Sequence, residues 1–276
     1  MSEDDVTFES ALGLTASGAG SDLGVSSWRT QIGAEWAQGR AIFGGLVAGL
    51  MARALERELP AERTLRSCLI SFIAPAAHGE ALIEAKLLRA GRALTHGEAR
   101  LVQNGEPCAL MLAAYGERRQ TSLTVSGPSA PDFEAAEALS RLPYLEGVTP
   151  RFTKQIDFRV AGGHFLFMGA ERAKLSGYMR YARGGPSDAA GLLGLIDAWP
   201  PPVLAKLKKF APASTVTWMV DVIGELPARG TQSDAFYRYD AECIAAEGGY
   251  ASCEARVWGP DGRLVATSRQ MVVEFS

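Results

Sequence analysis

The sequence lacks the patterns that identify several common classes of protein. Its net charge is −3 and its pI about 5.8, so no overall basic field is present to recruit nucleic acid. No apolar run approaches the roughly 20 residues that cross a bilayer. The acidic start, MSEDDVTFES, lacks the basic and then apolar pattern of a secretory signal. We therefore expect a cytoplasmic protein with neither nucleic-acid nor membrane partners.

Cysteine and histidine are also scarce. The four cysteines form no Cys-x-x-Cys pair, and the three histidines are scattered along the chain. Neither Gly-x-Ser-x-Gly nor His-Glu-x-x-His occurs, which argues against a serine-hydrolase triad and a zinc site. We expect reduced thiols, no bound metal and no cofactor.

Two stretches of the chain are apolar on nearly every side. They are residues 43–55 (FGGLVAGLMARAL), whose only charge is Arg53, and residues 187–199 (SDAAGLLGLIDAW). A helix at a protein surface keeps a polar face, so each stretch predicts a buried helix. A curved antiparallel sheet can wrap such a helix while pairing its own backbone groups.

Strand-like sequence follows each predicted helix. Four runs follow the first, and Asn104-Gly105 between the last two is a strong hairpin signal. Four runs also follow the second, with Asp261-Gly262 in the corresponding place. The chain of 276 residues has ample material for two medium domains. We predict two similar units, at 1–120 and 151–276, joined by a connector at 121–150 that is rich in Ser, Thr, Pro and Gly at its start.

Several segments resemble the acyl-CoA thioesterase family that carries two hot-dog halves in one chain. They are GGLVAGLMARAL, ARLVQNGEPCALMLAAY, ASTVTW and DGRLVATSRQMVVEF, and the resemblance runs from about Ser27 to Phe275. It implies an α+β tandem double hot-dog, each half a curved antiparallel sheet wrapped around a long apolar helix. It also implies hydrolysis of acyl-CoA to a free carboxylic acid and coenzyme A. The sequence departs from the family at Leu46, usually Gln, and at Thr217-Trp218, often an Asp-His pair.

Asp197 is the most informative candidate for thioester hydrolysis. Attack of water on a thioester needs a carboxylate, polar groups that hold the water, and N–H donors for the developing oxyanion. Asp197 is the only charged residue from Ala189 to Ala205. It lies near the end of its predicted helix, where the macrodipole disfavours a carboxylate by about 0.3–1 kcal/mol. A carboxylate at a position that its helix dipole disfavours is a functional candidate. The alternative is that Asp197 points to solvent.

The resemblance implies that Asp197 works with Thr215 and Gln270 to hold the attacking water. From the residues alone, Thr215 is an ordinary strand residue, and Gln270 on the last strand faces either water or the interior. Thr217 lies two residues further along the strand of Thr215 and shares its predicted face, so it is the alternative hydroxyl.

Comparison of the two halves predicts a single reaction centre. Matching the helix starts pairs Ala54 roughly with Asp197, and matching the hairpin turns pairs Ala113 with Gln270. Polar residues therefore concentrate in the second half.

Other residues are candidates for binding the substrate. Gly44 and Gly45 either offer N–H groups at a helix start or permit close packing. Lys206, Lys208 and Lys209 either meet the phosphates of coenzyme A or form a solvated face. The apolar clusters Phe165–Met168 and Trp218-Met219 are interpreted as core packing in preference to an acyl channel.

Two other functions stay open from the sequence. One is a non-catalytic protein that binds acyl-CoA or lipid, which the departures at Leu46 and Trp218 favour. The other is an enoyl-CoA hydratase on the same fold, which requires an Asp/His pair, whereas no His lies near either predicted helix. Association into a homo-oligomer is also possible.

Overall fold

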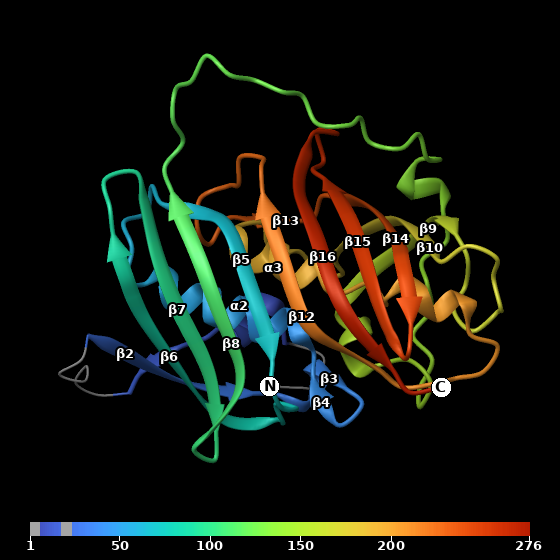
Figure 1. The fold of residues 1–276 in the computed structure, drawn as a ribbon, viewed down its shortest axis with the longest axis horizontal. Helices are drawn as coiled ribbons and strands as arrows, with labels where there is room; N and C mark the ends of the chain where they lie inside the picture. The colour runs from blue at the N-terminus through green and yellow to red at the C-terminus, as the bar shows by residue number, and fades with distance from the viewer. Residues whose placement is uncertain (1–5, 18–23) are drawn as a thin grey trace.

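The computed structural model describes residues 6–17 and 24–276, so the first five residues of the acidic start lie outside the described residues. Its main feature is one twelve-stranded sheet in which every neighbouring pair is antiparallel. The strand order is β1-β2-β6-β7-β8-β5-β12-β16-β15-β14-β10-β9. The strands of the first half are therefore joined to those of the second by the β5–β12 pair, and two helices lie together on one side of the sheet (Figure 1).

The described part of the first half contains the short helix α1 (Phe8–Ala11), the buried helix α2 (Gly44–Glu56) and eight strands: β1 (Thr15–Ala16), β2 (Val25–Ile32), β3 (Ala37–Gln38), β4 (Ala41–Ile42), β5 (Thr64–Phe72), β6 (Gly79–Ala90), β7 (Leu94–Gln103) and β8 (Glu106–Gly116). A 3₁₀ turn, η2 (Ala34–Trp36), precedes β3. Asn104 and Gly105 have φ values of 54° and 82°, as the hairpin signal between β7 and β8 predicts.

After the connector, which arches over one end of the sheet (Figure 1), the second half contains the buried helix α3 (Ala189–Ile196) and eight strands: β9 (Ile156–Gly163), β10 (Lys174–Tyr181), β11 (Gly185–Pro186), β12 (Ala213–Val222), β13 (Gln232–Ser233), β14 (Tyr237–Glu247), β15 (Tyr250–Trp258) and β16 (Leu264–Glu274). The second half also has the 3₁₀ turns η4 (Arg151–Gln155) and η5 (Pro202–Lys206), and a further one, η3 (Ala136–Ala138), lies in the connector.

The α+β architecture with two buried helices is confirmed, and two local predictions need correction. The second helix ends at Ile196, three residues before its predicted end, because the chain turns there toward three consecutive prolines. The sequence of residues 152–159 also looks like a strand, but it starts as the 3₁₀ turn η4, and extended structure begins only at Ile156.

Glycines allow α2 and α3 to pack directly against each other in antiparallel directions. A Cβ on Gly45 would lie 3.0 Å from the Cα of Gly194, and one on Gly49 would lie 3.3 Å from the Ala190 carbonyl oxygen. Larger side chains at these positions would push the helices apart. No helix in the described residues is long and apolar enough to cross a membrane.

Candidate active site

Asp197 and Gln270 meet in the structure. Asp197 is the C-cap of α3, directly after its last residue, and Gln270 lies on β16 opposite Trp218, whose side chain is fully buried. Because residues directly opposite in an antiparallel pair share a face, Gln270 points to the interior of the fold. Its Nε2 donates a hydrogen bond of 2.8 Å to Oδ1 of Asp197.

The start of α2 faces the same carboxyl group from the other half of the chain. A Cβ on Gly44 would lie 2.7 Å from Oδ2 of Asp197, so only glycine fits there without displacing the acid. The backbone N–H of Gly45 also faces the carboxyl and lowers its pKa. Asp197 therefore lies at the negative end of its own helix and at the positive end of the neighbouring one.

Burial dominates the protonation of Asp197. Removal from water raises the pKa of its carboxyl group to about 7, while the Gln270 amide and the Gly45 N–H act in the opposite direction. Asp197 retains some contact with solvent. A carboxyl group that titrates near neutral pH is suited to accept a proton from water.

A β-bulge decides which threonine faces this site. The β12–β16 register shifts between Thr215 and Thr217, so that Thr215 lies opposite Val272, which is fully buried, and Thr217 lies opposite Met271, which is exposed. The prediction that the two threonines share a face is wrong, because the inserted residue reverses the alternation. Thr215 lies on the interior face with Gln270, and Thr217 on the outer face.

The first half has the same bulge, but apolar residues stand at the positions of Thr215 and Gln270. The β5–β8 register shifts between Leu65 and Ser67, with Cys68 opposite Ala113. Leu65 therefore corresponds to Thr215, and Ala113 to Gln270 as the sequence predicts. The set of polar groups is not repeated at these positions.

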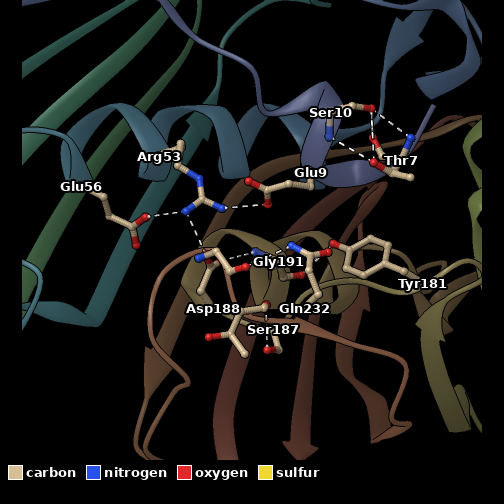
Figure 2. Close-up of polar contacts among 12 residues, drawn as sticks. Thr7, Glu9, Ser10, Arg53, Glu56, Tyr181, Ser187, Asp188, Gly191 and Gln232 are labelled. Atoms are coloured by element: carbon tan, nitrogen blue, oxygen red, sulfur yellow. Dashed lines mark hydrogen bonds and ion pairs between the residues drawn. The ribbon is translucent and has the colours of Figure 1, made fainter. Parts of the chain in front are cut away.

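An ionic cluster occupies the opposite end of the α2–α3 contact. Arg53 lies among three carboxylates, with donor–acceptor distances of 2.8 Å to Asp188, 3.3 Å to Glu9 and 3.4 Å to Glu56 (Figure 2). Asp188 also accepts from the Gly191 N–H and so caps α3. The two ends of the helix pair therefore differ: Asp197 lies at one end with Gln270, and Arg53 lies at the other end among three carboxylates.

The remaining predicted residues lie at the end of η5 and just after it. Lys206, Lys208 and Lys209 are all exposed, and the Lys206 ammonium donates to the Glu171 carbonyl oxygen at 2.9 Å. Their contact with coenzyme A phosphates stays a prediction.

Two surface hollows lie away from the three proposed catalytic residues. Their volumes are about 300 and 350 Å³, and their linings do not include Asp197, Thr215 or Gln270. Among the residues the structure describes, no group of three His, Cys, Asp or Glu side chains is arranged to hold a metal ion. All three histidines are exposed.

The two departures from the family pattern are structural residues here. Leu46 and Trp218 are fully inaccessible to solvent, and the Trp218 indole donates to the Ser268 hydroxyl at 2.8 Å. Of the two clusters interpreted as core, Phe165, Met168 and Met219 are instead exposed, which contradicts that interpretation for them.

Comparison with known proteins agrees with this architecture. Residues 32–116 match the acyl-CoA thioesterase N-terminal domain, and residues 129–273 match the acyl-CoA thioesterase C-terminal domain. No curated protein matches the chain.

Several solved structures are similar over nearly the whole chain. A conserved hot-dog protein of unknown function from Alicyclobacillus acidocaldarius is 25% identical, with a TM-score of 0.85 and 98% of each chain covered. A putative thioesterase II from Thermobifida fusca YX is 21% identical, with a TM-score of 0.81 and coverage of 98% of this chain and 97% of that one. An acyl-CoA thioesterase II from Mycobacterium marinum is 18% identical, with a TM-score of 0.72 and 98% of each chain covered. The two domain matches together span most of the chain, which therefore belongs to the acyl-CoA thioesterase family of double hot-dog thioester hydrolases.

Proposed function

We propose that this chain hydrolyses acyl-CoA to a free carboxylic acid and coenzyme A by direct attack of a water molecule held by Asp197, Thr215 and Gln270. The observation that carries the proposal is the hydrogen bond of 2.8 Å from Gln270 to Asp197. It supports a catalytic set because the counterparts of Thr215 and Gln270 in the first half are apolar. We also propose the cytoplasm as the location; association into homo-oligomers stays a prediction.

The proposed reaction uses each group in one role. Asp197 takes a proton from the water as the water oxygen attacks the thioester carbonyl carbon. Gln270 donates to Asp197 through its Nε2, which leaves its carbonyl oxygen to accept from the water, and the Thr215 hydroxyl orients the water. The C–S bond then breaks, and the departing thiolate of coenzyme A takes up the proton.

The charge that develops on the carbonyl oxygen needs donors. The N-terminus of α2 supplies a positive dipole end at Gly44 and Gly45, beside the acid. We infer that the thioester carbonyl binds there. This arrangement would make one site from both halves, with the acid from the second and the helix N-terminus from the first.

Free thiol released from a panel of acyl-CoAs tests the proposal. We expect Asp197→Asn to lower kcat by about 10²–10⁴, the usual contribution of a general base. Asp221→Asn is the matched control, because Asp221 lies on β12 of the same sheet and its carboxylate accepts from Ser67 instead. Undiminished turnover in Asp197→Asn would remove Asp197 from the mechanism, and tight binding of acyl-CoA without thiol release would favour the non-catalytic alternative.

Measurement of stability distinguishes a loss of catalysis from a loss of folding in Asp197→Asn. The carboxyl group binds its proton more tightly in the folded chain, with a pKa of about 7, than in an unfolded chain, with a pKa of about 3.9. Its ionisation therefore lowers stability as the pH rises between these values. We expect the Tm of Asp197→Asn at neutral pH to equal or exceed that of the wild type.

A further inference from the structure

Two loops at one end of the molecule expose large apolar side chains. They are residues 164–173, between β9 and β10, and residues 202–212, which run from η5 to β12; we call them the loop pair. Phe165, Met168 and Phe210 are 65%, 73% and 78% exposed. The loop pair lies at the end of the molecule opposite β2 (Figure 1).

The loop pair is held in shape, so this exposure does not result from a loose segment. Three backbone hydrogen bonds of 2.8–2.9 Å join it, from the N–H groups of Phe167, Gly169 and Ala170 to the carbonyl oxygens of Leu204, Leu207 and Ala205. The ring centroids of Phe167 and Phe210 are 5.4 Å apart. Residues of the same loops pack inward on a separate core cluster, which holds in place the backbone that carries the outward side chains.

The loop pair is also basic, although the whole chain has a net charge of −3. Its charged side chains are one acid and four bases, namely Glu171, Arg172, Lys206, Lys208 and Lys209. All five residues are exposed. Exposed apolar groups beside basic ones are the combination by which proteins bind an anionic bilayer surface.

The position of the loop pair relates it to the proposed reaction site. The core cluster beneath it includes Cys253 and Val272. Cys253 lies opposite Gln270, and Val272 lies opposite Thr215. The loops therefore cover the part of the sheet that carries two of the proposed catalytic residues, and an amphiphilic substrate bound at a lipid surface would meet the protein here.

We propose that the loop pair is a docking surface for an anionic lipid bilayer, with Phe165, Met168 and Phe210 inserted among the lipids and the lysines facing the headgroups. This surface changes the sequence-based expectation of no membrane partner. The proposal describes binding to one face of a bilayer, and it does not depend on whether the chain hydrolyses thioesters.

Cosedimentation of the intact chain with vesicles tests this inference. We expect binding to equimolar phosphatidylcholine–phosphatidylglycerol vesicles, little binding to phosphatidylcholine alone, and weakening by salt. Phe210→Ser should lower the partition coefficient about tenfold. The double variant Lys208→Gln, Lys209→Gln should lower it about fivefold for each lysine.

Matched variants elsewhere on the surface separate specific docking from general stickiness. Ile223→Ser changes an apolar side chain that is 65% exposed outside the loop pair, and Arg89→Gln, Arg92→Gln changes two exposed charges; both should leave vesicle binding unchanged. Phe210→Ser should also leave hydrolysis of a soluble short-chain acyl-CoA unchanged. No binding to anionic vesicles, or equal losses in the control variants, would overturn the proposal, whether or not the chain hydrolyses thioesters.

Discussion

At the scale of single residues, Asp197 brings together two requirements of a general base. Its carboxyl group is shielded enough for its pKa to rise to about 7, and it is held by the Gln270 amide at 2.8 Å. Burial alone would favour the protonated acid, which cannot accept a proton from water. Gln270 and the Gly45 N–H oppose that effect and keep a usable fraction of Asp197 ionised at neutral pH.

Replacement of Gln270 should therefore change the pH dependence of turnover as well as its size. In the wild type, kcat should fall as the pH drops below about 7 and Asp197 takes up a proton. In Gln270→Ala, the lost donor raises the pKa of Asp197 further, so this limb should move to higher pH and the plateau of kcat should fall about tenfold or more. The measurement is kcat against pH for both enzymes.

Gln31→Ala is a suitable control because Gln31 is an exposed glutamine on β2. It should leave the pH profile unchanged. An acidic limb at the same pH in Gln270→Ala and wild type would contradict this account of Gln270.

At the scale of elements, the bulge in β12 determines the composition of the site. Two threonines two residues apart would face the same way in a regular strand. The extra residue between them turns Thr215 toward the interior and Thr217 toward the outer face, where it lies opposite Met271. Strand β5 has the corresponding bulge, so both halves share it. The first half has Leu65 beside its bulge, where the second half has Thr215.

The two threonines provide a direct test of this geometry. Thr215→Val keeps the side-chain shape and removes the hydroxyl, so kcat should fall about tenfold through loss of a hydrogen bond to the water. Thr217→Val makes the same chemical change on the outer face and should keep kcat within about twofold. Thiol-release assays on both variants, with Tm as the check on folding, distinguish them; equal losses would mean that the bulge does not select the catalytic hydroxyl.

At the scale of the whole molecule, local patterns predicted more of the fold than of the contacts between the halves. The apolar stretch that became α2 and the Asn104-Gly105 turn depend on neighbours in sequence, so they were predictable. The bulge is a property of strand pairing and leaves no clear local pattern. The cluster at Arg53 was missed because its partners Glu9 and Asp188 lie 44 and 135 residues away in the chain.

That cluster holds the two buried helices together at the end away from Asp197. Asp188 is 1% exposed and Glu56 is 3% exposed, and Arg53 is the cation that pairs with both carboxylates (Figure 2). A second arginine, Arg229, donates to the Glu56 carbonyl oxygen and to that of Leu59 at 3.0 Å, near the end of α2. Arginines of both halves therefore stabilise this part of the interface.

Removal of Arg53 should destabilise the fold far more than removal of an exposed arginine. Arg53→Met keeps a side chain of similar length but removes the cation that pairs with two buried carboxylates, so we expect a loss of about 3–5 kcal/mol in the free energy of unfolding by urea. The loss should be larger above about pH 7, because burial raises the pKa of Glu56 to about 7 and protonation removes its charge at lower pH.

Arg100→Met is the control: Arg100 is half exposed, pairs with Glu98 at 3.4 Å and should change stability by about 1 kcal/mol or less. Similar losses in the two variants, or a loss independent of pH, would show that the Arg53 cluster does not hold the halves together through its charges.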